Sequence, residues 1–168
     1  DEETGDNLKV NGDADLNFTL QPTGRMNLTG VYDVAGGQYE MNLYNLVNRT
    51  FTLDPSSRVS WSGDPFDAKL DVRAVYSVDA SAAPLMAITS TSDDPAAQSQ
   101  YRQQLPFLVY LNIDGDLLSP EINFALDLPE DEQGALGGEV YSRVQQVNQQ
   151  TGELNRQVFS LLVLNRFY

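Results

Sequence analysis

The feature that most constrains this chain is a series of short segments in which apolar and polar residues alternate. Alternation with a period of two is typical of β-strands that have one buried face and one solvent-facing side. Such segments follow one another from Leu8 to Leu128, and turn-forming residues separate them about every 10 residues. The sequence therefore predicts a mainly β fold.

The clearest of these patterns surrounds Trp61, the only tryptophan of the chain. Residues 62–65 are turn-forming, and a second alternating segment starts at Phe66. Gly63 can adopt dihedral angles that other residues avoid, and Pro65 disfavours a helical conformation at the residue before it. The pattern predicts a corner between two strands, with Trp61 and Phe66 as core aromatic residues beside the turn.

Two glycine-containing pairs predict further turns. Asn11-Gly12 is a strong hairpin signal, because both positions of a tight hairpin turn favour positive φ. Gly36-Gly37 interrupts the alternation in the same way. We therefore expect the chain to reverse direction at both pairs.

The chain divides at residue 129 into two predicted regions. Residues 1–129 form a β-rich sheet domain with a frayed acidic start, and residues 80–104, rich in Ala, Ser, Asp and Pro, form a long loop. Residues 130–168 form an acidic linker and two amphipathic helices, because apolar residues recur there at helical spacing. These helices either simply cover the sheet or cap an apolar groove. The apolar helix positions are Val140, Val144, Val147, Val158, Leu161 and Leu162.

Composition excludes several classes of function. A net charge of −14, from 24 acidic and 10 basic residues, repels phosphates and anionic headgroups, so we expect no nucleic-acid partner. This negative charge does not exclude apolar contact with lipid tails. The chain has no cysteine or histidine, which excludes disulfides, thiolate chemistry and histidine-based triads. We expect no enzymatic activity and no cofactor. We also expect no metal, since the calcium-loop-like segment after Asn112 has Leu117 where that loop needs glycine.

Several segments resemble, in order, the C-terminal domain of TamB, the translocation and assembly module subunit of diderm bacteria and a relative of AsmA-like proteins. The resemblance covers roughly residues 25–168 and is nearest to the Bacteroidetes-type members. Its most specific segments are Trp61-Ser-Gly-Asp-Pro65 and Leu154-Asn-Arg-Gln157-Val-Phe159-Ser-Leu-Leu. The shorter ones are Gly30-Val-Tyr32, Gly36-Gly37-Gln-Tyr39, Pro120-Glu-Ile122-Asn-Phe124 and Leu128-Pro129.

The resemblance implies a long curled sheet, antiparallel or mixed, shaped like a β-taco or an open barrel, with an apolar inner face. It implies a periplasmic cell-envelope protein that parts outside this segment anchor in the inner membrane. This end would lie near the outer membrane, beside a TamA-like barrel of the BamA family. The implied role is phospholipid transport between the membranes, outer-membrane protein assembly, or both. Because family members continue past the last shared segment, we expect this chain to be an excised segment.

Phospholipid acyl chains are the expected ligand, since burial of each methylene contributes about 0.8 kcal/mol without any headgroup contact. Residues on the apolar face are either lipid contacts or ordinary core. The groove candidates, chosen by alternation, are Leu28, Tyr32, Met41, Trp61, Leu70, Val72, Phe107, Val109, Phe124 and Leu126. Two other functions stay open. One is an extracellular glycan-binding β-sandwich with an exposed Trp61, and the other is a docking or chaperone platform whose sheet edge pairs with the barrel.

Overall fold

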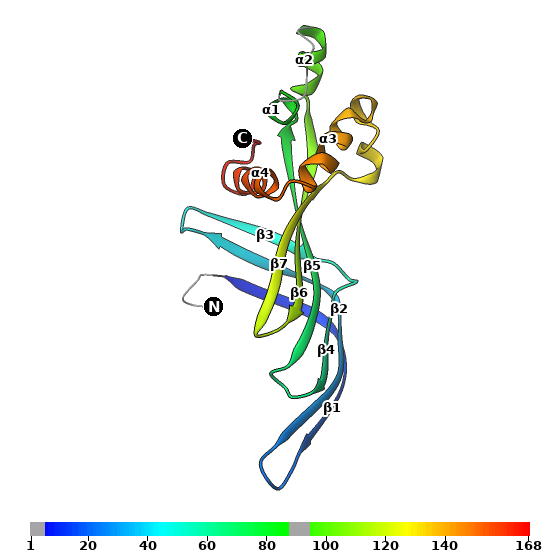
Figure 1. Ribbon diagram of the computed structural model, residues 1–168, viewed down its shortest axis with the longest axis vertical. Coiled ribbons are helices and arrows are strands. Elements are labelled where there is room, and N and C mark those ends of the chain that lie inside the picture. Colours follow the sequence, from blue (N-terminus) through cyan, green and yellow to red (C-terminus); the bar gives the residue numbers. More distant parts are fainter. Residues whose placement is uncertain (1–5, 88–94) are drawn as a thin grey trace. The chain divides into compact units, whose positions relative to one another are not determined.

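The computed structural model describes residues 6–87 and 95–168 (Figure 1). Except for Asp6, the predicted frayed start lies outside the described residues. The structure is mainly β, with 52% strand. The strands are β1 (Asn7–Leu20), β2 (Met26–Leu43), β3 (Val47–Leu53), β4 (Arg58–Gly63), β5 (Ala68–Ser81), β6 (Gln104–Asp116) and β7 (Ser119–Asp127). The helices are α1 (Ala83–Met86), α2 (Pro95–Tyr101), α3 (Glu139–Asn148) and α4 (Thr151–Leu164), with 3-10 turns at Glu130–Glu132 and Ala135–Gly138.

The seven strands form one antiparallel sheet in the order β1-β2-β3-β5-β6-β7, and β4 pairs with both β2 and β5. The order does not close, because β1 and β7 lie at opposite ends of it. The predicted mainly β fold with an open sheet and two C-terminal helices is therefore confirmed, and the sheet is antiparallel rather than mixed.

The predicted turn at Gly36-Gly37 is wrong, because β2 runs through it. On one side β2 pairs with β1 from Met26 to Glu40. On the other side its Leu28–Asp33 segment pairs with β4 and its Gln38–Leu43 segment pairs with β3. Gly37 has a φ of +143°, and a Cβ there would lie 2.2 Å from the Lys9 carbonyl oxygen. The glycine pair thus marks the place where β2 changes partner.

The predicted hairpin at Asn11-Gly12 is also wrong. These residues lie inside β1, where the register against β2 shifts between Asn11 and Gly12. A Cβ on Gly12 would lie 2.3 Å from the Asp33 carbonyl oxygen and 2.8 Å from the Tyr32 ring. Asn11 pairs with Gly36 and Gly12 pairs with Val34, so the extra residue is Ala35 and the irregularity is a β-bulge in β2 opposite this pair.

The predicted corner after Trp61 is present. β4 ends at Gly63, and the Asp64 side chain accepts a hydrogen bond from the Phe66 backbone N–H at 2.9 Å. Trp61 is half-buried, and its indole N–H donates to the Pro65 carbonyl oxygen at 3.1 Å. Phe66 is 61% exposed, so its prediction as a core residue is wrong. It lies in the turn, before the alternation of β5 begins.

The chain divides into two compact units. Unit 1 consists of Asp1–Val75 and Leu111–Asn123, and unit 2 consists of Tyr76–Tyr110 and Phe124–Tyr168. The long strands β5, β6 and β7 each contribute to both units. The predicted boundary at residue 129 therefore does not coincide with the division into units, since parts of these three strands belong with the C-terminal helices.

The prediction of one long loop over residues 80–104 is wrong where α1 and α2 form. Helix α1 has a proline in its first turn, and α2 begins at Pro95. Proline is tolerated at the start of a helix, because the N–H groups of the first turn have no intrahelical partner. The prolines that indicated a loop here begin helices instead. Residues 88–94 lie outside the described residues.

Unit 2 has its own core beneath α3 and α4. The predicted helix positions are all buried in it, from Val140 in α3 to Leu162 in α4. The ring of Phe167, which follows α4, meets the ring of Phe107 on β6 edge to face, with centroids 4.6 Å apart. The helices thus use their apolar faces to cover strands of unit 2.

Candidate functional site

An apolar groove with a volume of about 370 Å³ lies within unit 1. The register explains why its residues share a face, since Tyr32 stands opposite Val59 and Val59 stands opposite Leu70. The sheet of this unit curls around that face, and each strand from β1 to β6 contributes to it. The lining residues are Leu8, Val10, Tyr32, Val34, Tyr39, Leu53, Val59, Leu70, Val72, Ala74, Leu111 and Ile113.

The turn between β3 and β4 is hydrogen-bonded to two strands that line the groove. Ser57, which is 2% exposed, accepts from the Arg73 N–H at 2.9 Å and donates to the Arg73 carbonyl at 3.3 Å. Its own carbonyl accepts from the Val34 N–H at 3.0 Å. The Ser56 N–H donates to the Asp54 carboxylate at 2.8 Å, and this bond lowers the pKa of Asp54. The turn therefore joins β2 to β5 at the place where β2 changes partner.

One end of the groove carries a polar contact. The hydroxyl of Tyr39 donates to the Asp6 carboxylate at 2.6 Å, and the other carboxylate oxygen accepts from the Asn42 N–H at 2.8 Å. Burial, followed by the hydrogen bond and the charge of Asp6, raises the pKa of Tyr39 well above its ordinary value. The hydroxyl therefore stays protonated and directs its hydrogen at Asp6. The aromatic ring is the part of Tyr39 that is left to line the groove.

The structure brings three of the predicted groove residues together, because Tyr32, Leu70 and Val72 all line the groove. The other candidates of unit 1 do not line it. Trp61 is half-buried and stands opposite Gly30, next to the Tyr32–Val59 pair. The remaining half-buried candidates of this unit are Leu28 and Met41.

The candidates of unit 2 lie elsewhere. Phe107, Val109 and Leu126 are at most 1% exposed and belong to the core beneath the helices. Phe124 is half-buried. Phe107 and Val109 alternate in step with Leu111 and Ile113 along β6, but only the last two reach the groove. Alternation identifies the face of a residue, not what covers it.

Sequence reasoning missed most of the lining. The alternation pattern did contain a signal for the missed residues, since each of them belongs to an alternating segment. The sequence did not reveal the register with which β2 pairs on either side of its bend. The lining residues not predicted are Leu8, Val10, Val34, Tyr39, Leu53, Val59, Ala74, Leu111 and Ile113.

The sheet and its groove define a mainly β domain with an open, concave apolar face. The family model of the TamB C-terminal domain matches residues 1–168, the whole chain, and the chain therefore belongs to that family. The family is one of cell-envelope proteins. No curated protein matches the chain. Within residues 6–87 and 95–168, no helix is long and apolar enough to cross a membrane.

Proposed function

We propose that the apolar groove holds acyl chains of phospholipids. In this proposal the chain is the outer-membrane-proximal domain of a periplasm-spanning, TamB-like protein that carries phospholipid between the inner and outer membranes. The observation that supports it best is the uninterrupted apolar lining from β1 to β6. The groove volume of about 370 Å³ also lies within the range of ligand sites, about 300–1,000 Å³.

The chemistry of the lining suits binding without reaction. Each buried methylene contributes about 0.8 kcal/mol, so an acyl chain needs no headgroup-specific residue to be retained. The lining residues carry no charge, and the hydroxyl of Tyr39 already donates to Asp6. A groove without a general base or nucleophile favours a carrier role over an enzymatic one.

A second function, docking to a TamA-like barrel during outer-membrane protein assembly, is favoured by β1. This strand stands at the end of the strand order and pairs only with β2 among the described strands. All of its residues are exposed. A long edge strand of this kind can add a strand from a partner through backbone hydrogen bonds.

The glycan-binding alternative has less support. It required an exposed Trp61 in a shallow cleft, but this residue is half-buried and its indole N–H binds the Pro65 carbonyl. The group that would stack on a sugar and donate to it is therefore partly covered and already partnered.

Photo-crosslinking from inside the groove tests the lipid proposal. A photoreactive phenylalanine analogue replaces Leu70, which lines the groove, in a diderm host. The matched control carries it at Asp71, the next residue of β5, which is exposed on the other face. We expect phospholipid adducts at position 70 and none at position 71.

The adducts distinguish the candidate functions. Protein adducts at position 70 would favour assembly of membrane proteins over lipid transport. A folded protein with equal or no lipid adducts at the two positions would contradict the proposal. Fluorescence of Trp61, which lies in unit 1 with both positions, reports whether the variants fold.

A further inference from the structure

The hairpin of β1 and β2 exposes a row of apolar side chains on one face. The register places Phe18 opposite Leu28 and Leu20 opposite Met26, and opposite residues share a face. Phe18 and Leu20 are 58% and 65% exposed. Exposed apolar rows of this kind mark binding surfaces. This row, the hairpin face, consists of the exposed Leu16, Phe18, Leu20 and Met26 and the half-buried Leu28.

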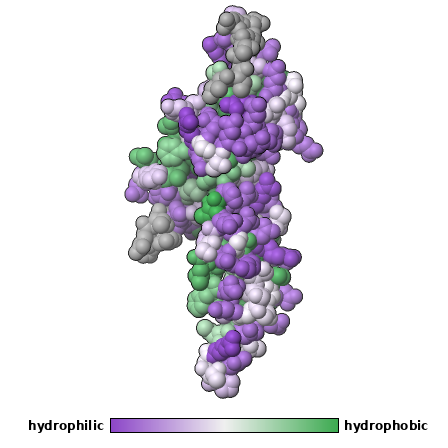
Figure 2. Space-filling view, in the orientation of Figure 1, coloured by the Kyte–Doolittle hydropathy of each residue, from purple (hydrophilic) through white to green (hydrophobic). Residues whose placement is uncertain are grey.

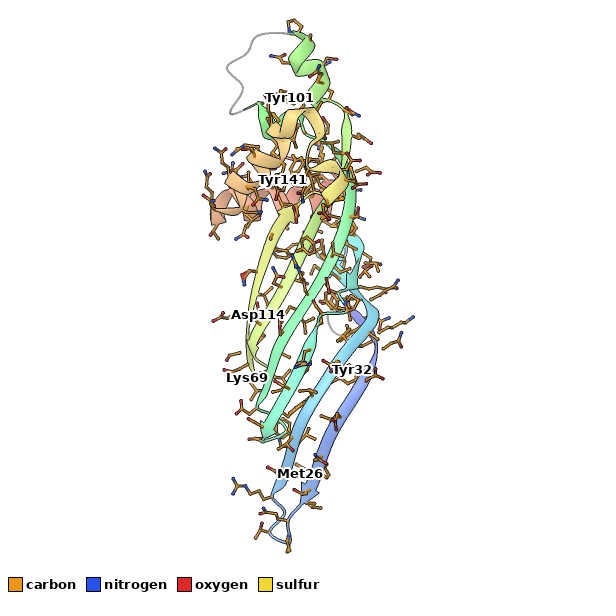
Figure 3. All side chains as sticks on the ribbon, turned by 90° about the vertical axis from the view of Figure 1, so that its right-hand side faces the viewer. Met26, Tyr32, Lys69, Tyr101, Asp114 and Tyr141 are labelled. Carbon is orange, nitrogen blue, oxygen red and sulfur yellow. The ribbon has the colours of Figure 1, made fainter. Side chains whose placement is uncertain are left out.

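Among the described strands, none besides β1 and β2 pairs with the end of this hairpin. β4 pairs with β2 only from Leu28 to Asp33, so Met26 pairs with β1 alone. Figure 1 shows the hairpin extending past β4, and Figure 3 shows Met26 near its tip with Tyr32 farther along β2. The hairpin face is therefore open to a partner at the tip. Toward its base it leads to Tyr32, which lines the groove.

The end of the hairpin, residues 16–32, differs in charge from the chain as a whole. From Leu16 to Tyr32 there is no acidic residue, and Arg25 is the only charged one, in a chain with 24 acidic residues and a net charge of −14. Most of the surface visible in Figure 2 is hydrophilic, with smaller apolar patches. This end of the hairpin has no acidic residue to repel phosphate-bearing headgroups, whereas Asp13, Asp15 and Asp33 lie farther along the same two strands. Arg25 is exposed in the turn, where it can bind a phosphate.

We propose that the β1–β2 hairpin inserts its apolar face into the surface of a phospholipid bilayer, with Arg25 at headgroup level. Phe18, Leu20 and Met26 would enter the region between headgroups and acyl chains, where their apolar surface leaves water. This inference goes beyond the proposed function, because surface contact does not require an occupied groove. The hairpin face and the groove meet at Tyr32, so the contact would also give acyl chains an apolar route into unit 1.

Flotation with vesicles tests this contact. The chain of residues 1–168 is mixed with vesicles of phosphatidylethanolamine and phosphatidylglycerol, and its partition coefficient is compared with that of the double variant Phe18→Ser/Leu20→Ser. Loss of two apolar side chains that the bilayer would bury should lower the partition coefficient by about tenfold or more. Both residues are exposed in the free protein, so the variant should keep its fold, which thermal unfolding verifies.

The matched control is Leu118→Ser. Leu118 is 76% exposed in the turn between β6 and β7, but Asp116 and Glu121 lie close to it in sequence. Its replacement should leave flotation unchanged. An equal loss in this control would overturn the proposal, as would a loss only with Leu46→Ser in the β2–β3 turn, where Leu46 is 74% exposed.

Two further results separate this contact from lipid binding in the groove and from self-association. Val72→Asp, inside the groove, should keep flotation while lipid crosslinking from position 70 is lost, so the surface contact and the proposed function can fail independently. Sedimentation detects association between copies of the chain. If Phe18→Ser/Leu20→Ser dissociates an oligomer without changing flotation, the hairpin face binds a second copy and the proposal is overturned.

Discussion

The side-chain amide of Asn148 binds both backbone groups of Leu126. Its Oδ1 accepts from the Leu126 N–H and its Nδ2 donates to the Leu126 carbonyl, each at 2.8 Å. Leu126 lies on β7, an end strand of the sheet, so the amide occupies the position of a neighbouring strand at this residue. In unit 2 the last residue of α3 is thus fixed to the edge of the sheet, and one pair of unpaired strand groups is satisfied.

Asn148→Asp should destabilise unit 2 by about 1–3 kcal/mol, because a buried polar group that loses its partner costs that much. The carboxylate still accepts from the Leu126 N–H, but it cannot donate to the carbonyl and places a charge against it. Denaturant unfolding followed by helical circular dichroism measures the loss. Asn155→Asp, on the exposed side of α4, is the matched control and should change stability little. Equal losses in the two variants would contradict this role of Asn148.

The bend of β2 gives a second prediction from adjacent glycines. Gly37→Ala should destabilise unit 1 by more than about 1 kcal/mol, since its φ of +143° is strained for alanine and the new Cβ would lie 2.2 Å from the Lys9 carbonyl oxygen. Gly36→Ala places its Cβ in open space and should stay within about 0.5 kcal/mol of the parent. Denaturant unfolding followed by the fluorescence of Trp61 compares them. Equal stability of the two variants would show that β2 bends without need of Gly37.

The burial of Tyr39, together with its contact to Asp6, makes the free energy of unfolding depend on alkaline pH. Folding raises the pKa of Tyr39, mainly through burial, so the folded chain holds this proton more tightly than the unfolded chain. The resulting stability is fully present below the unfolded tyrosine pKa of about 10 and decreases as pH rises above it. Tyr39→Phe should remove part of this decrease. Unfolding free energies between about pH 8 and about pH 11 measure it, and Tyr44→Phe, exposed in the β2–β3 turn, is the control. A profile of Tyr39→Phe that equals the parent profile would exclude this linkage.

Alternation along strands was the part of the fold that the sequence predicted best. It placed Tyr32, Leu70 and Val72 on the face that forms the groove, because the side chains of a strand point alternately to its two sides. Helical spacing likewise predicted the apolar helix positions from Val140 to Leu162, all of which are buried. These features depend on residues close in sequence, which is where a periodic pattern carries information.

Pairing between distant segments was the part that local signals predicted wrongly. Asn11-Gly12 and Gly36-Gly37 suit turns, yet both lie inside paired strands, beside the register shift at which Ala35 of β2 has no partner in β1. The backbone of Asp33 passes close to Gly12, and that of Lys9 passes close to Gly37. The glycines are required by close approach of another strand, a contact that no local pattern reveals. For the same reason the sequence did not reveal that helices cover Phe107 while Leu111 stays in the groove.

The ring contact between Phe107 and Phe167 should hold the C-terminal residues against unit 2. Phe107 is completely buried and Phe167 is 3% exposed. The chain reverses at Asn165, which has a φ of 56°, and Gln157 accepts from the Tyr168 N–H at 2.8 Å, so the position of Phe167 is fixed on both sides.

Phe107→Ala and Phe167→Ala should each cost about 3–5 kcal/mol, the usual loss for a buried phenylalanine. The double variant should lose less than the sum of the two by about 0.5–1.5 kcal/mol, because an edge-to-face pair contributes that much beyond its buried area. Helical circular dichroism in denaturant measures all members of the cycle. Phe159→Ala, 51% exposed on α4, is the matched control and should cost far less. Strict additivity of the two buried substitutions would mean that the rings stabilise unit 2 through separate contacts, and that the C-terminal residues are held by Gln157 rather than by Phe107.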